Sequence, residues 1–308
     1  MKNILCITPV KHLNGVFESF GHYGEVVYEP NLSKDELRQL LGSSFIDRIF
    51  TNPNKQGFIL DESVLAGSSV KIINTCSTGT NHIDMEYCLK NDIKVWALTK
   101  DMELINELPS TSELAFGLMC SLFRKIDAGF TDVKNGRWDY EPFMGKQIKG
   151  SSIGIIGFGR LGKIMKKFCE AFDMRVNIYD PYEGYHDLNG LLLNSEVISL
   201  HVHVTEETRD IVDDDFLARM QKGSYLVNTS RGELVDENAI INSIKRGHLN
   251  GYATDVIRDE FGDCRSSKLV AYSKVNSNVL ITPHVGGMTW EGQTKAYKWA
   301  INKFKETV

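Results

Sequence analysis

The segment 151–180, SSIGIIGFGRLGKIMKKFCEAFDMRVNIYD, constrains the fold more than any other part of the chain. A short apolar run leads into Gly157, Gly159 and Gly162 at G-x-G-x-x-G spacing. An amphipathic pattern of helical period follows, and a second apolar run ends at Asp180. A glycine motif alone is weak evidence, but the order strand, glycine turn, helix, strand and acid is typical of a dinucleotide-binding βαβ unit.

Each glycine has a mechanical reason in such a unit. Gly157 permits the tight turn from strand to helix, Gly159 lets the backbone approach a pyrophosphate, and Gly162 lets the helix pack closely on the strand. The N-terminus of the helix offers unpaired N–H groups and a partial positive charge to phosphates. Asp180 can accept hydrogen bonds from both hydroxyls of an adenosine ribose, and it would repel a 2′-phosphate. The segment therefore predicts NAD, rather than NADP, as the cofactor.

Whole-chain properties narrow the class of protein. A length of 308 residues exceeds the size at which one hydrophobic core stops growing, so two domains are expected. The net charge of −5 argues against nucleic acid as a partner. No apolar run approaches the length of a membrane span, and the N-terminal run is too short for a signal peptide. The six cysteines show no paired or metal-binding spacing, which indicates free thiols in a cytoplasmic protein and no metal site.

Short apolar runs alternate with helical patterns on both sides of the glycine motif. This alternation predicts an α/β fold with parallel sheets. We expect two Rossmann-like, doubly wound domains. An NAD-binding domain of six parallel strands spans 104–284 and is inserted into a flavodoxin-like substrate domain formed by 1–103 and 285–308.

Three polar residues follow strands of the expected NAD-binding domain. Arg231 comes after LVNTS, Glu260 after GYATDV, and His284 closes LITPH. The carboxyl ends of parallel strands meet at one edge of a sheet, so these side chains should converge. Each alone is more often a surface or turn residue. Together they suit hydride transfer at a carbon beside a carboxylate: arginine binds the acid, histidine moves a proton, and glutamate orients the imidazole.

The loop 75–84, TCSTGTNHID, follows a strand of the first domain and has two interpretations. The N–H groups of Thr78 and Gly79 could bind a small carboxylate. Alternatively, the loop is an ordinary turn in which Asn81 and Asp84 cap the next helix. We expect His82 to be a loop or helix-start residue and not a ligand.

Six runs resemble motifs of the NAD-dependent, D-isomer-specific 2-hydroxyacid dehydrogenase family, and phosphoglycerate dehydrogenase-like members in particular. They are STGTNHID (77–84), IGFGRLG (156–162), SLHVHVTEETRDIV (199–212), VNTSRGELVDENAI (227–240), ATDVIRDE (253–260) and ITPHVGGMT (281–289). They occur in the family's order over nearly the whole chain.

The resemblance implies an oxidoreductase that acts on a small D-2-hydroxy acid or its 2-keto acid. Arg231, Glu260 and His284 match the family's catalytic residues, while Thr78 and Gly79, with Arg231, match its substrate-binding groups. Asp255 resembles the aspartate that meets the nicotinamide carboxamide. The other positions that match cofactor contacts are Arg160, Leu161, His201, Thr208, Thr229, Ser230 and Gly286. A homodimer formed through the cofactor domains is also implied.

Some positions depart from the family's pattern. His203 and Phe261 stand where prolines are usual, which puts local loop shape in question, and Ser112 replaces a helix-start alanine. Lys55 is the only cation in the loop where phosphoglycerate dehydrogenases carry an arginine, so phosphate recognition stays open. The three residues Arg231, Glu260 and His284 favour an enzyme, but the related corepressors retain the same set. The alternative function is therefore a non-catalytic, NAD(H)-responsive scaffold of the corepressor type.

Overall fold

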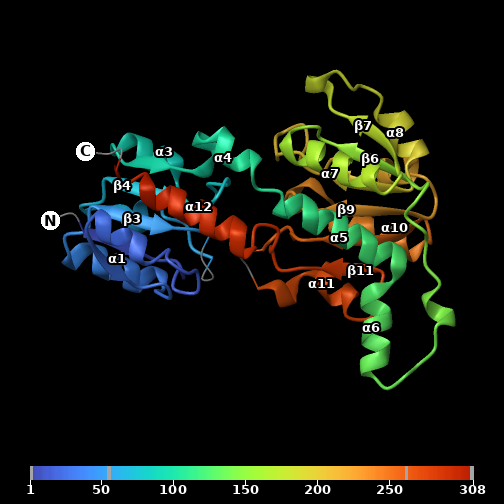
Figure 1. The fold of residues 1–308 in the computed structure, drawn as a ribbon, viewed down its shortest axis with the longest axis horizontal. Helices are drawn as coiled ribbons and strands as arrows, with labels where there is room; N and C mark the ends of the chain where they lie inside the picture. Colours follow the sequence, from blue (N-terminus) through green and yellow to red (C-terminus); the bar gives the residue numbers. More distant parts are fainter. Residues whose placement is uncertain (1–2, 54–56, 261–262, 306–308) are drawn as a thin grey trace. The chain divides into compact units, whose positions relative to one another are not determined.

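The structure is a computed structural model that describes residues 3–53, 57–260 and 263–305. Contacts divide the chain into two compact units (Figure 1). Unit 1 comprises residues 1–108 and 288–308, and unit 2 comprises residues 109–287. The boundaries predicted from the sequence, 103/104 and 284/285, lie a few residues before these divisions. In the described part of the chain, no helix is long and apolar enough to cross a membrane.

Unit 1 is built on a five-stranded parallel sheet. Its strands lie in the order β2-β1-β3-β4-β5, which is the order of flavodoxin-like folds. The strands are β1 (Asn3–Cys6), β2 (Glu25–Tyr28), β3 (Arg48–Thr51), β4 (Ile72–Thr75) and β5 (Lys94–Trp96).

Alternate side chains of these strands face two helical layers. Leu5, Ile49 and Ile73 pack against α1 (Lys34–Ser43), α2 (Glu62–Leu65) and α3 (Met85–Lys90). Ile4, Phe50 and Ile72 face the other layer. That layer contains η1 (Glu18–His22), η2 (Leu98–Lys100), α4 (Met102–Asn106) and the C-terminal helix α12 (Trp290–Asn302).

Two buried polar side chains of the sheet hold the C-terminal end of α12. Arg48 Nη1 donates to the Phe304 carbonyl at 3.1 Å, and Asn74 Nδ2 donates to the Ala300 carbonyl at 2.7 Å. The Ala300 carbonyl is among the last acceptors of the helix, which have no partner within it, and Phe304 lies just beyond the helix end. Chain segments far apart in the sequence are thereby joined in one core.

Unit 2 contains a six-stranded parallel sheet in the order β11-β10-β9-β8-β6-β7. Its strands are β6 (Ser152–Ile156), β7 (Arg175–Tyr179), β8 (Val197–Leu200), β9 (Ser224–Asn228), β10 (Leu249–Thr254) and β11 (Val279–Ile281). The chain reverses direction across the sheet between β6 and β8, and such switch points are where doubly wound sheets bind ligands. The predicted α/β class with two doubly wound parallel sheets is confirmed.

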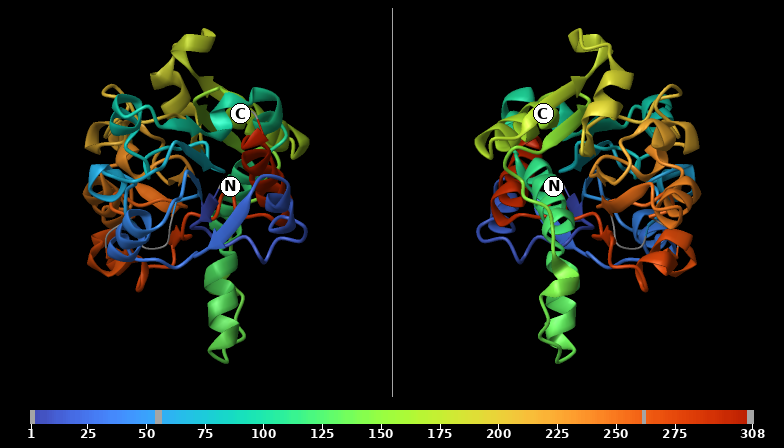
Figure 2. Two further views of the ribbon diagram at one scale, coloured as in Figure 1. Left: turned by 90° about the vertical axis from the view of Figure 1, so that its left-hand side faces the viewer. Right: turned by 90° about the vertical axis from the view of Figure 1, so that its right-hand side faces the viewer.

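Helices cover both faces of this sheet as well. One face packs against α8 (Leu188–Asn194), α9 (Asp214–Arg219), α10 (Glu237–Lys245) and α11 (Lys268–Ser273), and the other against α5 (Ser110–Arg124) and α7 (Arg160–Ala171). Short 3-10 helices are η3 (Glu141–Phe143), η4 (Pro181–Glu183), η5 (Gly232–Leu234) and η6 (Cys264–Ser266). Helix α6 (Ile126–Lys134) differs from the α-helices that cover the sheet, because it projects from the body of unit 2 and buries none of its residues (Figures 1 and 2).

Phe50 provides a test of the core of unit 1. It is fully buried, and its ring contacts those of Phe20, Tyr297 and Phe304. We expect Phe50→Ala to lower the free energy of unfolding of this unit by about 3–5 kcal/mol, because it leaves a cavity. Urea denaturation measures the change. The matched control is Phe45→Ala, since Phe45 is 63% exposed, and equal effects of the two variants would contradict this account of the core.

Candidate active site

The three glycines between β6 and α7 have different structural roles. Gly157 has a φ of +94°, and a Cβ on it would lie 2.5 Å from the His201 carbonyl oxygen. A Cβ on Gly162 would overlap the Gly157 carbonyl oxygen. A Cβ on Gly159, in contrast, would meet nothing within 4 Å. Backbone packing therefore requires two of the glycines, while the third leaves open space at the N-terminus of α7.

This open space suits an anionic ligand. Arg160 and Leu161 are the first residues of α7, and no side chain caps the helix. The first turn of a helix carries N–H groups and the positive end of the helix dipole, and both suit a phosphate. Asp180, at the end of β7, lies beside the turn and accepts hydrogen bonds from Phe158 N–H at 2.7 Å and Tyr182 N–H at 3.0 Å. Its carboxylate is thus fixed next to the glycine turn.

Two buried polar atoms after β8 and β9 have no hydrogen-bond partner among the described residues. They are His201 Nδ1 and Thr229 Oγ1. His201 Nε2 lies 2.9 Å from the Ser199 hydroxyl, and burial lowers the pKa of its imidazole to about 4, so the ring is neutral. Unpaired buried polar atoms are costly, and at this edge of the sheet a bound dinucleotide could satisfy them.

Two nearby residues shape the backbone of the same edge. The Ser230 hydroxyl donates to the Leu200 carbonyl at 2.8 Å and so links β9 to β8. The Thr208 hydroxyl donates to the His203 carbonyl at 2.6 Å and accepts from Thr205 N–H at 2.8 Å. These bonds close the turn at 203–208, in which His203 replaces the usual proline.

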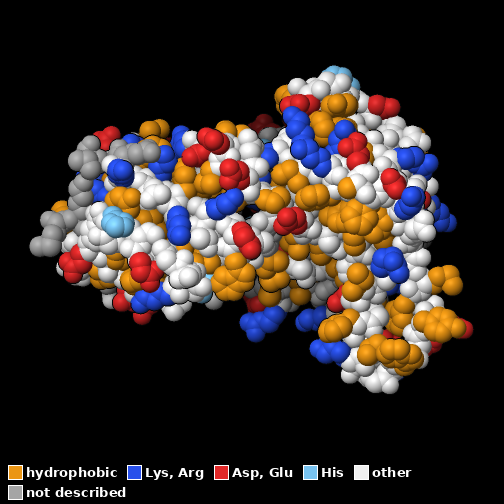
Figure 3. All heavy atoms as spheres, in the orientation of Figure 1, with side chains coloured by type: hydrophobic (Ala, Val, Ile, Leu, Met, Phe, Trp, Pro, Cys, Tyr) orange, Lys and Arg blue, Asp and Glu red, His pale blue; other side chains and the backbone are white. Residues whose placement is uncertain are grey.

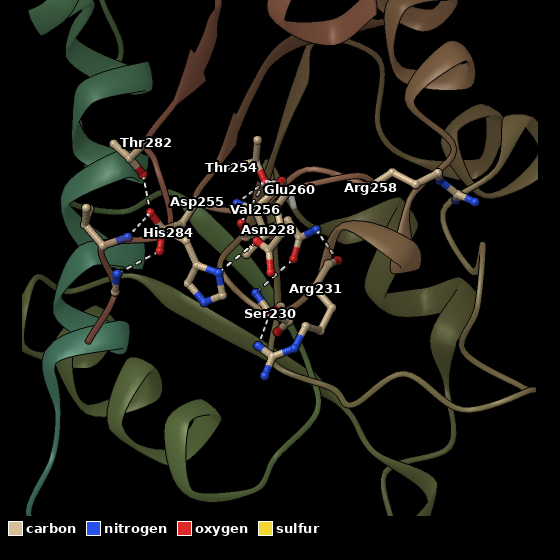
Figure 4. A network of polar contacts seen from close by, with 12 residues as sticks. Asn228, Ser230, Arg231, Thr254, Asp255, Val256, Arg258, Glu260, Thr282 and His284 are labelled. Carbon is tan, nitrogen blue, oxygen red and sulfur yellow. Dashed lines mark hydrogen bonds and ion pairs between the residues drawn. The ribbon is translucent and has the colours of Figure 1, made fainter. Parts of the chain in front are cut away.

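His284 and Glu260 form a direct pair at the ends of β11 and β10 (Figure 4). Glu260 Oε2 lies 2.8 Å from His284 Nδ1. The histidine side chain is 46% exposed and the glutamate 19%, so one side of the imidazole stays accessible. The hydrogen bond to Glu260 raises the pKa of His284, against an opposing effect of burial. The charges of Glu260 and Asp255 raise it further, and that of Arg231 lowers it.

The backbone of His284 is held in an unusual conformation. Its φ is +54°, in the left-handed region that residues other than glycine rarely adopt. Its N–H donates to the Asp255 carbonyl at 2.9 Å. The buried Asp255 carboxylate also accepts from the Thr282 hydroxyl at 2.6 Å, Val285 N–H at 2.8 Å and Gly286 N–H at 2.7 Å (Figure 4). These four bonds fix the turn that carries the histidine.

Arg231 follows β9 and completes the cluster. Its Nη1 donates to the Ser230 carbonyl at 2.7 Å, and its own carbonyl accepts from Asn228 Nδ2 at 2.9 Å. Asn228 also accepts from Ser230 N–H at 3.0 Å. In Figure 4 the guanidinium of Arg231 lies on the same side of the sheet edge as the imidazole of His284. Unit 2 therefore brings together Arg231, Glu260 and His284, all three of which were expected from strand ends.

The loop after β4 belongs to unit 1. Thr78 N–H has no acceptor among the described residues, whereas Gly79 N–H donates to the Ser77 hydroxyl at 3.1 Å. Asp84, and not Asn81, caps α3 by accepting from Tyr87 N–H at 2.9 Å. Both interpretations of the loop therefore have support: it caps a helix, and it leaves one amide available for a ligand.

Two residues that organise the site were not predicted from the sequence. Asn228 and Thr282 organise the turns of Arg231 and His284, and their only signal in the sequence is that each is polar and lies at the end of an apolar strand. Lys55 and Phe261 lie outside the described residues. Among the residues that are described, no group of three or more histidine, cysteine, aspartate or glutamate side chains could hold a metal ion.

The pairing of His284 with Glu260 predicts how the histidine titrates. Its pKa should lie above the ordinary histidine value of about 6.5, so the imidazole stays protonated to higher pH. Glu260→Gln removes the main cause and should move the titration to lower pH. NMR titration of the imidazole, assigned with His284→Gln, measures the shift, and the other histidines provide an internal control. An unchanged His284 titration in Glu260→Gln would contradict the assignment.

Comparisons with known proteins agree with this geometry. Residues 116–286 match the family model described as D-isomer specific 2-hydroxyacid dehydrogenase, NAD binding domain. The chain is 32% identical to a hydroxypyruvate reductase of Thermotoga maritima, over 91% of this chain and 90% of that protein. It is 30% identical to a D-3-phosphoglycerate dehydrogenase of Methanocaldococcus jannaschii, over 92% of this chain and 54% of that one. The structure superposes on the apo D-lactate dehydrogenase of Escherichia coli with a TM-score of 0.84 and 25% identity, covering 100% and 98% of the two chains. The chain therefore belongs to the D-isomer-specific 2-hydroxyacid dehydrogenases, which are NAD-dependent oxidoreductases, and residues 116–286 form its NAD-binding domain.

Proposed function

We propose that the chain interconverts a small 2-keto acid and the corresponding D-2-hydroxy acid, with His284 as the acid/base, Glu260 as its partner and Arg231 as the substrate-binding cation. The observation that carries this proposal is the 2.8 Å contact between His284 Nδ1 and Glu260, beside Arg231 at the same sheet edge. An imidazole paired in this way has one nitrogen fixed and the other free to exchange a proton with a ligand.

This arrangement determines which nitrogen of His284 exchanges the proton with the substrate. Nδ1–H of His284 donates to the Glu260 carboxylate, which leaves Nε2 for the substrate oxygen. In the reducing direction the protonated Nε2 donates its proton to the carbonyl oxygen, and in the oxidising direction the neutral Nε2 accepts the hydroxyl proton. Bound NAD(H) supplies the hydride chemistry. Glu260 stabilises the charged imidazole and so favours the form that starts a reduction.

Arg231 is proposed to bind the carboxylate of the substrate. A guanidinium can bind a carboxylate through two parallel hydrogen bonds and can also polarise a neighbouring carbonyl. Its main chain is held through Asn228, and its charge acts on His284, so substrate bound to it would lie beside the proton donor. The Thr78 amide of unit 1 is proposed as a second contact for the substrate carboxylate, whereas the Gly79 amide, expected from the sequence to share this role, already donates to the Ser77 hydroxyl.

The residues of unit 2 fit the cofactor. The uncapped N-terminus of α7 and the open space at Gly159 suit a pyrophosphate, and the fixed carboxylate of Asp180 suits the ribose hydroxyls. Asp255 Oδ2 accepts from Gly286 N–H. A carboxylate oxygen can accept two hydrogen bonds, so this atom could also accept one from a carboxamide.

A direct assay can identify the 2-keto acid that the protein prefers. Relatives of the chain carry the names hydroxypyruvate reductase and D-3-phosphoglycerate dehydrogenase, so the panel should include phosphorylated and unphosphorylated acids. Glyoxylate, hydroxypyruvate, pyruvate, 2-oxoglutarate, branched 2-keto acids and 3-phosphohydroxypyruvate cover these classes. Loss of NADH absorbance reports turnover.

His284→Asn tests the acid/base role in this assay. We expect kcat for the best 2-keto acid to fall about a hundred- to ten-thousandfold, because the proton donor is lost. NADH binding, followed by its fluorescence, should be retained. His22→Asn, a change at an exposed histidine of unit 1, should leave turnover unchanged. Full turnover by His284→Asn would exclude the role. If NADH binds but no acid is reduced by the wild type, the corepressor-type scaffold gains support, and NADH-dependent partner binding is measured next.

A homodimer formed through the projecting part of unit 2 is our second proposal. Ile126, Phe130 and Val133 are exposed and spaced to share one face of α6. Three more exposed apolar side chains follow in the segment after the helix: Trp138, Tyr140 and Met144. We call these six residues the α6 surface, and Figure 3 shows apolar side chains gathered on this part of the molecule. A contiguous apolar surface of this kind on a protein exposed to water is typical of an interface.

Oligomeric state tests this surface. We expect the wild type to sediment as a dimer, and Phe130→Asp combined with Trp138→Ser to shift it to a monomer, because the pair removes large apolar side chains that association would bury. Leu193→Asp is the control, since Leu193 is equally exposed but lies on α8. A monomeric wild type, or an unchanged dimer in the double variant, would argue against this interface.

A further inference from the structure

The loop after β4 is ordered by hydrogen bonds that begin at the buried side chain of His82. The Thr75 hydroxyl lies 2.9 Å from His82 Nε2, and Ser77 N–H donates to Thr75 Oγ1 at 3.4 Å. Gly79 N–H in turn donates to the Ser77 hydroxyl at 3.1 Å. Thr78 N–H, between these two donors, has no acceptor among the described residues. The loop thus consumes the amides of residues 77 and 79 internally and leaves that of Thr78 for a ligand.

The backbone around His82 is itself fixed. The His82 carbonyl accepts from Leu60 N–H at 2.9 Å, and Asp84 N–H donates to the Leu60 carbonyl at 3.0 Å. Leu60 and Ile83 are buried in the apolar cluster beneath α1, α2 and α3. The imidazole is therefore anchored to the core of unit 1 on one side and to the loop on the other.

Burying the His82 imidazole costs free energy, because one of its polar atoms has no partner in the part of the chain that the structure describes. His82 is 2% exposed, and its Nδ1 has no partner among the described residues. Burial lowers the pKa of its imidazole to about 4, so the ring is neutral at ordinary pH. An apolar side chain would fill the same space without leaving a polar atom unpaired. An apolar side chain, however, could not make the contact of Nε2 with the Thr75 hydroxyl.

Counting unpaired atoms indicates the direction of that contact. If Nε2–H donates to Thr75 Oγ1, both Nδ1 and the Thr75 hydroxyl hydrogen lack partners. If the hydroxyl donates to Nε2, only Nδ1–H lacks one. The second arrangement also leaves a Thr75 lone pair for Ser77 N–H. The neutral ring thus acts as an acceptor that orients the threonine hydroxyl.

We infer that His82 is a positioning residue for substrate binding: through the Thr75 hydroxyl it sets the turn at Ser77–Gly79 so that the Thr78 amide is presented to the substrate carboxylate. This inference rests on the proposed function. It differs from the expectation drawn from the sequence, in which His82 was only a loop or helix-start residue.

The test compares variants of the full chain. His82→Leu removes the acceptor, and Thr75→Val removes the hydroxyl with little change of shape. Each should raise KM for the preferred 2-keto acid about three- to tenfold, which corresponds to the net worth of one hydrogen bond. The Kd of oxamate, a 2-keto acid analogue, in the presence of saturating NADH should rise by a similar factor and needs no turnover. Because the acid/base pair and the glycine turn lie in unit 2, kcat and NADH affinity should stay unchanged.

Two further variants separate positioning from folding. His82→Gln keeps an acceptor near the position of Nε2 and should restore KM toward the wild-type value. The double variant His82→Leu, Thr75→Val should be no worse than either single variant, because both act through one contact. His22→Leu, at an exposed histidine of the same unit, is the control that should leave KM unchanged.

Each outcome decides the inference. A rise in KM and oxamate Kd with rescue by His82→Gln supports it, whereas unchanged values in His82→Leu and Thr75→Val overturn it while leaving the proposed function intact. If His82→Leu does not fold, Thr75→Val alone decides in the same way. If the wild type neither reduces any acid nor binds oxamate, the proposed function fails and this inference fails with it.

Discussion

One buried carboxylate, that of Asp255, determines the shape of the turn that carries His284. It accepts hydrogen bonds from the Thr282 hydroxyl and from the N–H groups of Val285 and Gly286, while its backbone carbonyl accepts from His284 N–H. A left-handed conformation at a residue other than glycine costs of order 1–3 kcal/mol. Hydrogen bonds to a charged acceptor contribute roughly 1.5–3 kcal/mol each, so the bonds to Asp255 offset the strain at His284. The turn therefore keeps the conformation in which the His284 imidazole contacts Glu260.

The buried and the exposed histidines show how environment decides the use of one side chain. His82 and His201 are desolvated without a charged partner, and their pKa values fall to about 4, so they act as neutral hydrogen-bonding groups. His284 has an accessible side and a carboxylate partner, and its pKa rises. A ring that must carry a proton needs the environment of His284, while a ring that only orients a hydroxyl functions best when it never ionises.

The parts of the fold that depend on local patterns were predictable from the sequence. Alternating apolar runs predicted the α/β class with parallel sheets, and the spacing of Gly157, Gly159 and Gly162 predicted the turn before α7, where local backbone packing requires Gly157 and Gly162. The bonds of Asp255 to Val285 and Gly286 were not predictable, since they join residues far apart in the sequence across two strand ends. The loop bonds of Gly79 also escaped prediction, because backbone conformation decides which amides a turn uses for itself.

The charges around His284 couple its protonation to the occupancy of Arg231. The guanidinium lowers the pKa of the imidazole, while Glu260 and Asp255 raise it. A carboxylate bound to Arg231 would neutralise this cation, so the histidine would hold its proton more firmly in the complex than in the free protein. A 2-keto acid entering the site would thereby favour the protonated form that its reduction requires. An alcohol product keeps the same carboxylate, which would slow the reverse proton transfer at low pH and make oxidation favourable only as the pH rises.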